Sequence, residues 1–230
     1  MTQKKQNEDK IIKRMTKKQL GREVTRILTE IYPDAECALN YEGDPFKLIV
    51  MARLSAQCTD ARVNLVCETL FKKIPTMEAM ANADIAVIEE LIRSCGLYRM
   101  KARDLKEMSI QLIEDHGGSV PSDMDALLSL SGVGRKIANL IRGDLYGLPA
   151  IVADTHCIRI CGRLGFYPEG LKDATKVEKE LVKYIEPSEQ SDFCHRIVFF
   201  GRETCSAKSP RCDQCRLNGI CKKYAKEHKK

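Results

Sequence analysis

Lys136 is the side chain of this sequence best placed to act as a nucleophile or to bind an anion. It follows the segment Gly132-Val133-Gly134, whose two glycines allow a tight turn and a close backbone approach. Helical patterns on both sides predict a helix, a hairpin turn and a second helix, which begins with unpaired N–H groups. Such groups bind anions, and a DNA phosphate suits them. Glycine turns between helices are common, so a solvated lysine remains an alternative for this motif alone.

Four cysteines near the C-terminus are the second candidate for chemistry. They are separated by six, two and five residues, so four thiols fall within seventeen residues. Four thiolates can enclose a soft metal. Zinc sites usually contain two close Cys-x-x-Cys pairs, whereas one pair with longer arms suits a wider iron–sulfur cluster. The spacing therefore favours [4Fe–4S] and leaves zinc open. The cysteines of this tetrad are Cys205, Cys212, Cys215 and Cys221.

The remaining cysteines do not share this clustering. Each of the seven stands singly on an apolar face, and we expect small core residues there. The tetrad segment is instead polar and carries Lys208, Arg211 and Arg216, so it doubles as a basic patch. Because so little of it is apolar, we expect it to fold only around a metal. The seven are Cys37, Cys58, Cys67, Cys95, Cys157, Cys161 and Cys194.

Positive charge is concentrated at the two ends of the sequence. The chain has 230 residues, 43% of them hydrophobic, and a net charge of +6. Residues 1–22 and residues 202–230 each carry a net charge of +6, which leaves residues 23–201 at about −6. A polyanion would therefore meet the two ends. The N-terminus has no apolar secretory segment and no apolar run reaches membrane-spanning length, so we expect a reducing, cytoplasmic setting.

Apolar residues recur with helical spacing along most of the chain, which predicts an all-α fold. Residues 1–19 are polar and basic, and we expect a loose arm there. Ser122, three residues before Asp125, is predicted to cap the helix that precedes the turn. Two short helices are predicted to start after Thr76 and Asp84. The other predicted helices cover residues 20–31, 44–56, 59–71, 98–115, 122–128, 134–146, 154–164, 174–185 and 190–200.

Four motifs in this order resemble the endonuclease III family of helix-hairpin-helix DNA glycosylases/AP lyases. The resemblance covers residues 20–225 and implies two helical lobes. A six-helix barrel with the hairpin would take residues 38–148. Residues 20–37 and 149–230 would form a lobe around a [4Fe–4S] cluster held by the tetrad. The motifs are Leu54-Ser55-Ala56-Gln57-Cys58-Thr59-Asp60, Gly96-Leu97-Tyr98, residues 130–138 with Val152-Ala153-Asp154-Thr155-His156, and the tetrad.

The resemblance also implies a mechanism on duplex DNA that contains a damaged base or an abasic site. Lys136 matches the lysine that attacks C1′ of a flipped nucleotide, usually an oxidised pyrimidine, and forms a Schiff base. Elimination of the 3′ phosphate then cleaves the strand. The attacking amine must be neutral, so we expect a pKa below the usual value of about 10.4 for lysine. Asp154 matches the aspartate that assists the lysine and stabilises positive charge on the sugar.

Other residues match the DNA-contacting positions of the family. Gln57 and Leu97 would fill the gap left by the flipped base, since a base inside a duplex is out of reach. Gly132, Gly134 and Arg135 would contact phosphate. The cluster would shape the basic patch without taking part in the reaction, because glycosyl transfer moves no electrons.

The sequence departs from the family pattern at three positions. Ser131 stands where the family usually has proline, Ile137 where threonine is typical, and Ala153 where valine is common. None of these changes removes a reactive group. We therefore expect an active enzyme. We also expect it to be monomeric and associated with the nucleoid.

Two other functions remain as alternatives. A monofunctional adenine or thymine-mismatch glycosylase of the same fold would lack a lysine at position 136. A non-catalytic helix-hairpin-helix module would need the two glycines of the hairpin but neither Lys136 nor Asp154. Substitution of Lys136 distinguishes these three functions.

Overall fold

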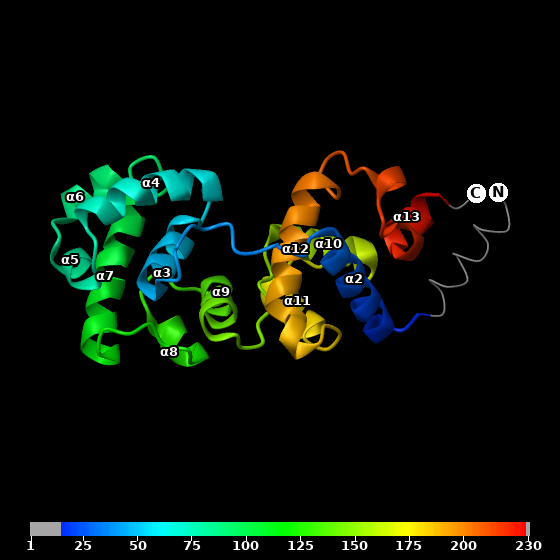
Figure 1. Ribbon diagram of the computed structural model, residues 1–230, viewed down its shortest axis with the longest axis horizontal. Helices are drawn as coiled ribbons and strands as arrows, with labels where there is room; N and C mark the ends of the chain where they lie inside the picture. Colours follow the sequence, from blue (N-terminus) through cyan, green and yellow to red (C-terminus); the bar gives the residue numbers. More distant parts are fainter. Residues whose placement is uncertain (1–14, 229–230) are drawn as a thin grey trace. The chain divides into compact units, whose positions relative to one another are not determined.

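The computed structural model describes residues 15–228 of the chain (Figure 1). Secondary structure in these residues is helical, which confirms the predicted all-α class. The chain divides into two compact units, one made of residues 37–147 and the other of the described residues before and after them. Most of the predicted N-terminal arm, residues 1–19, lies outside the described residues. None of the described helices is both long and apolar enough to span a bilayer.

The unit of residues 37–147 contains the hairpin. Its helices α5 and α6 pack against α7, and α3 packs against α9, around one apolar core that includes Leu54 and Leu105. The helices are α3 (Pro45–Leu54), α4 (Asp60–Lys73), α5 (Met77–Asn82), α6 (Ile85–Leu91), α7 (Tyr98–His116), α8 (Met124–Ser129) and α9 (Arg135–Tyr146).

The other unit brings both ends of the described chain together. Its central helix α12 packs against α2 and α10, and α10 also contacts α13. The α-helices are α2 (Lys17–Ile31), α10 (Thr155–Leu164), α11 (Ala174–Leu181), α12 (Gln190–Glu203) and α13 (Lys222–Glu227). Three single-turn 3₁₀ helices complete it: η1 (Pro187–Glu189), η2 (Cys212–Gln214) and η3 (Asn218–Ile220).

Side-chain caps set most helix starts where the sequence predicted them. Asp44 accepts hydrogen bonds from two backbone N–H groups of α3, and Thr59 caps α4. Helix α2 begins three residues before the predicted start, because Thr16 and Gln19 form a capping box. The predicted cap Ser122 is wrong. Asp123 caps α8 instead, since its carboxylate accepts the N–H groups of both Asp125 and Ala126.

The cysteines outside the tetrad are buried or half-buried, as predicted for core residues. They do not all stand singly, however. Hydrogen bonds with the Cys161 thiol and burial raise the pKa of Cys157, which also contacts Cys194. The thiols of Cys58 and Cys95 contact each other as well, although 37 positions separate them in the sequence.

Candidate functional site

The hairpin between α8 and α9 is anchored by its apolar residues and presents Lys136 to solvent. Leu130 and Val133 are buried, and the N–H of Val133 donates to the Leu130 carbonyl over 3.1 Å. Gly134 is the N-cap of α9, and no side chain caps this helix. Arg135 is half-buried, whereas Lys136, the second residue of α9, is exposed. The start of α9 therefore places backbone N–H groups that no side chain caps beside an exposed amine.

The structural requirement for glycine differs between the two glycines of the hairpin. Gly132 has φ of +74°, and a Cβ there would lie 2.5 Å from Nε of Arg53. Gly134 has φ of −98°, which any residue adopts, and within the described chain no obstructing atom lies within 4 Å of a Cβ placed there. The fold therefore requires glycine at position 132, while the space beside Gly134 is open.

This difference predicts opposite effects of two alanine substitutions. Gly132→Ala combines a left-handed backbone with a steric clash, so we expect a loss of about 2–4 kcal/mol in unfolding free energy. Gly134→Ala should cost no more than about 1 kcal/mol, the penalty of alanine at an N-cap, yet weaken DNA binding about tenfold by keeping a phosphate from the backbone. Thermal unfolding and duplex-binding titrations measure the two quantities separately. Wild-type DNA affinity in Gly134→Ala would show that no phosphate approaches this glycine closely.

Gln57 and Leu97 share an unusual backbone conformation. Their φ angles are +55° and +60°, in the left-handed region that non-glycine residues seldom occupy. Gln57 is exposed, and Leu97 is 50% exposed although it is a large apolar residue. A Cβ on Gly96 would lie 3.5 Å from the Gln57 carbonyl, so the two loops lie side by side. Such strain concentrates at functional sites.

Lys101 fixes the loop of Gln57 to helix α7. Its side chain is fully buried, and Nζ donates to the carbonyls of Leu54 and Ala56, each over 2.7 Å. These carbonyls belong to the end of α3 and the turn just before Gln57. Since Leu97 is the residue directly before α7, Lys101 holds both loops in one arrangement.

Asp154 is the N-cap of α10 in the other unit. Its Oδ1 accepts the N–H of Cys157 over 2.7 Å. The turn before it is held from α12, because the N–H of Val152 donates to Sγ of Cys194 over 3.2 Å. The carboxylate is half-buried, and only one of its oxygens is used in the cap bond, which leaves it able to interact with a ligand.

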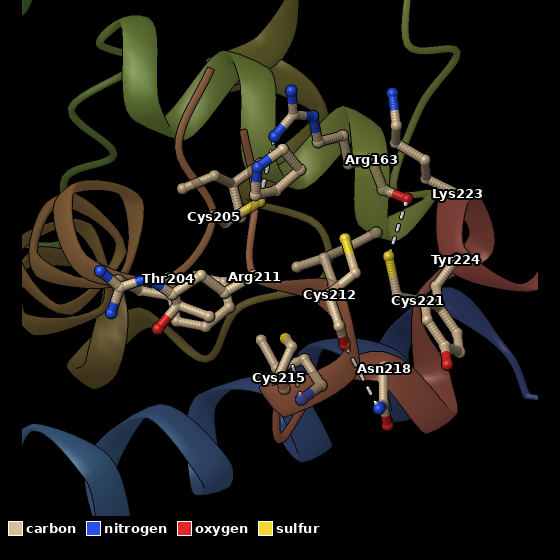
Figure 2. Close-up of a pocket in the computed structure, with 15 residues that line it drawn as sticks. Arg163, Thr204, Cys205, Arg211, Cys212, Cys215, Asn218, Cys221, Lys223 and Tyr224 are labelled. Atoms are coloured by element: carbon tan, nitrogen blue, oxygen red, sulfur yellow. Dashed lines mark hydrogen bonds between the residues drawn. The ribbon is translucent and has the colours of Figure 1, made fainter. Parts of the chain in front are cut away.

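The four cysteines of the tetrad line one pocket (Figure 2). The pocket encloses about 430 Å³ of space that no protein atom fills, part of it open to solvent. Among residues 15–228, no group of three or more His, Cys, Asp or Glu side chains is arranged to hold a metal ion. Burial raises the pKa of Cys215 to about 11, so binding a metal there must release a proton.

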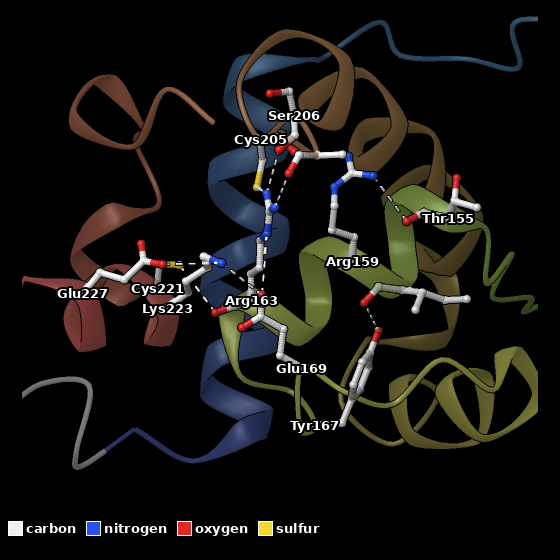
Figure 3. Close-up of polar contacts among 12 residues, drawn as sticks. Thr155, Arg159, Arg163, Tyr167, Glu169, Cys205, Ser206, Cys221, Lys223 and Glu227 are labelled. Carbon is white, nitrogen blue, oxygen red and sulfur yellow. Dashed lines mark hydrogen bonds and ion pairs between the residues drawn. The ribbon is translucent and has the colours of Figure 1, made fainter. Parts of the chain in front are cut away.

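Two arginines of α10 tie the tetrad segment to the helix that Asp154 caps (Figure 3). Arg163 donates to Sγ of Cys205 over 3.3 Å and to the carbonyls of Ser206 and Ala207. Arg159 donates to the Cys205 carbonyl over 3.1 Å. The start of the tetrad segment and α10 are therefore one hydrogen-bonded assembly.

Comparison with known proteins decides the family. Residues 50–187 match the HhH-GPD superfamily of base excision DNA repair proteins. Endonuclease III of Bacillus subtilis is 44% identical over 202 residues, which cover 87% of this chain and 91% of that protein. The chain belongs to the endonuclease III family. It is accordingly a DNA glycosylase with AP lyase activity, in base excision repair.

Solved structures of endonuclease III share the fold. A trapped endonuclease III–DNA covalent intermediate superimposes with a TM-score of 0.86 and 41% identity, covering 94% of this chain and all of that one. A non-covalent endonuclease III–DNA complex gives a TM-score of 0.86 and 42% identity over the same shares. Family membership therefore holds for nearly the whole chain.

Most of the site residues that the family resemblance implies lie in three places in the structure. Lys136 lies with the hairpin residues, Gln57 lies beside the Leu97 loop, and the tetrad lines one pocket. Lys136 and Asp154 belong to different units. Sequence reasoning missed Lys101, although a signal existed. This lysine falls on the same helical stripe as Leu105, Met108 and Leu112, all of them buried.

Proposed function

We propose that Lys136 is the nucleophile of this DNA glycosylase/AP lyase. Its amine attacks C1′ of the damaged nucleotide and the base departs, after which the amine nitrogen loses one proton. The C1′–O4′ bond then breaks as O4′ takes up a proton, which leaves a protonated Schiff base (an iminium) between Nζ and C1′ of the opened sugar. Removal of the C2′ proton then expels the 3′ phosphate. An amine is needed because only an amine yields the iminium that makes this elimination easy. The carrying observation is an exposed lysine on the first turn of an uncapped helix, directly after a glycine hairpin.

The substrate that best fits is duplex DNA bearing an oxidised pyrimidine or an abasic site. The N–H groups at the start of α9, which no side chain caps, suit a phosphate of the backbone and read no sequence. Relatives trapped covalently and non-covalently on DNA support the same partner.

We infer a barrel lobe of residues 38–148 and a cluster lobe of residues 20–37 and 149–230.

Asp154 is proposed to act on the sugar and on the lysine. A carboxylate can accept the proton that Lys136 must lose, and it can stabilise the positive charge that develops at C1′. Its bond to the N–H of Cys157 orients the side chain. Asp154 would thus combine a structural cap with a catalytic role.

Gln57 and Leu97 are proposed to fill the space left by the flipped nucleotide. An apolar side chain that is half exposed suits insertion into a base stack, and an amide can hydrogen-bond an unpaired base. The left-handed backbone at both residues supports this role, because such conformations persist where function requires them. Lys101 would hold the two side chains ready.

The tetrad is proposed to hold a [4Fe–4S] cluster. The pocket fits such a group, since four thiols surround it, apolar side chains such as Phe200 and Leu217 wall it, and Arg163 faces Cys205. One Cys-x-x-Cys pair with longer arms on either side suits this wider group better than a single zinc ion. The bound cluster would supply structure, by ordering the basic patch for DNA.

Borohydride trapping tests the proposed function. Wild-type protein is mixed with a duplex that contains one thymine glycol, and borohydride is added. Reduction of a Schiff base should give a stable protein–DNA adduct, together with base release and cleavage 3′ to the lesion. Base release without an adduct would instead indicate a monofunctional glycosylase. Duplex binding without release, on oxidised pyrimidines and abasic sites alike, would indicate a binding module.

A further inference from the structure

The hairpin turn lies directly on an ion pair whose arginine is buried and whose aspartate is half-buried. A Cβ on Gly132 would lie 2.5 Å from Nε and 2.7 Å from Cδ of Arg53, and 2.8 Å from Cβ of Asp104. Arg53 is 6% exposed and comes from α3, while Asp104 comes from α7. The position of the turn is therefore set by two side chains that lie far from it in the sequence.

The ion pair is also connected to the turn. Both Nε and Nη2 of Arg53 donate to Oδ2 of Asp104, the first over 2.8 Å. The other carboxylate oxygen, Oδ1, accepts from Oγ of Ser131 over 3.5 Å. A buried, charge-assisted contact of this kind holds its geometry better than an exposed pair.

Gln111 binds the backbone on both sides of Leu130. Its Oε1 accepts the N–H of Ser131 over 2.7 Å, and its Nε2 donates to the carbonyl of Ser129 over 3.4 Å. The short bond depends on an N–H at position 131. Proline, which is usual at this position in the family, has no N–H and could not make it.

We propose that Arg53, Asp104 and Gln111 are positioning residues for the hairpin, and we call them the hairpin floor. They set the backbone of residues 131–134 and so aim the start of α9, with Lys136, at the DNA backbone. This inference rests on the proposed function of Lys136. In this chain, hydrogen bonds from the floor fix the entry to the turn, a task that the ring of proline performs by restricting φ.

The proposal makes Gln111 and Ser131 energetically coupled. In the wild type, Ser131→Pro removes the N–H that Gln111 accepts and leaves Oε1 without that donor. In a Gln111→Ala background the same substitution removes an N–H that already lacks its partner. Leu130 has φ of −72° and ψ of 139°, the extended conformation that a residue before proline needs. Proline at position 131 can therefore be accommodated.

A double-mutant cycle on full-length protein tests this coupling. Affinity is titrated for a duplex containing tetrahydrofuran, an abasic analogue that cannot react. Gln111→Ala should weaken binding about fivefold, the effect of one hydrogen bond, whereas Ser131→Pro should bind within about twofold of the wild type, because the proline ring restrains the turn without the N–H. The double variant should bind within about twofold of the wild type, because proline replaces the lost restraint. Equal effects of Ser131→Pro in both backgrounds would overturn the proposal.

The salt dependence of binding separates positioning from general destabilisation. A displaced hairpin loses a phosphate contact, so the slope of log K against log salt should fall by about 1 in Gln111→Ala and return in the double variant. Asn82→Ala is a matched control, since the Asn82 amide also donates to a main-chain carbonyl of this unit, over 2.8 Å, on α5. It should leave the slope unchanged. A slope that is unchanged in Gln111→Ala would contradict a positioning role. So would a slope that is lowered equally in Gln111→Ala and Ser131→Pro.

Adduct formation by the wild-type protein tests the proposed function separately from this inference. If the wild type forms no adduct with a natural abasic site, the assignment of Lys136 fails. Thermal unfolding of the same four proteins still tests the floor, because the coupling between positions 111 and 131 must appear in the unfolding midpoint as well. Additive midpoints would overturn the floor whatever the outcome of trapping.

Discussion

Replacing Lys136 with glutamine is expected to abolish borohydride trapping and to lower strand cleavage by at least about 10³-fold, as loss of a nucleophile does. Glutamine is polar and only one atom shorter than lysine, but its amide cannot form an iminium. The side chain is exposed at the second position of α9, so folding should be unaffected. Gel analysis of a thymine glycol duplex, with and without borohydride, measures both quantities.

Binding shows whether the loss is chemical. Lys136→Gln should keep its affinity for a tetrahydrofuran duplex within about tenfold, because one cation among several phosphate contacts is removed. Lys73→Gln is a matched control, since Lys73 is an exposed lysine in the last turn of α4 in the same unit. It should keep full cleavage. Cleavage that survives in Lys136→Gln would show that another amine is the nucleophile.

The second large effect is expected at the tetrad. Cys212→Ser should lose bound iron and the visible absorbance of an iron–sulfur cluster, since a serine hydroxyl is a poor ligand for a soft metal. Metal binding to a structural site contributes on the order of 10 kcal/mol to folding of the segment it holds. The basic patch with Lys208 and Arg211 should then be disordered. We expect a markedly lower unfolding temperature and at least about tenfold weaker DNA binding.

Elemental analysis distinguishes the possible outcomes for the tetrad. Cys37→Ser changes a half-buried cysteine outside the tetrad and should retain iron and DNA affinity. Zinc in the wild-type protein would overturn the cluster assignment. A Cys212→Ser protein that loses iron yet binds DNA as the wild type does would show that the cluster has no role in shaping the patch.

Local signals in the sequence predicted the helices well. Asp44, Thr59, Thr76 and Asp84 cap the helices that they were expected to start, because a short polar side chain before an apolar stripe has one favourable use. Ser122 was wrong by one residue. Two neighbouring residues can both cap, and the carboxylate of Asp123 accepts two N–H groups at once.

Most contacts that support the site could not be predicted from the sequence, because they join residues that lie far apart in it. Arg53 and Asp104 meet across 51 positions, and Lys101 reaches carbonyls 45 and 47 positions away. Arg53 and Asp104 are ordinary charges in helices when the sequence is considered alone, whereas Lys101 falls on the apolar stripe of α7, a signal that sequence reasoning missed. The tetrad, by contrast, lies within one short segment, so its spacing indicates a metal site, and the resemblance favours a cluster over zinc. Resemblance supplied the roles of Gln57 and Leu97, and the structure adds their left-handed backbone, a conformation that Glu42 shares.

Identification of the trapped residue tests the central claim most directly. Wild-type protein is reduced onto an abasic-site duplex, the DNA and protein are digested, and the peptide that carries the sugar remnant is sequenced by mass spectrometry. The account predicts a single modified amine, Nζ of Lys136. A remnant on the N-terminal amine or on another lysine would contradict it, as would an efficiently cleaved duplex that yields no modified peptide.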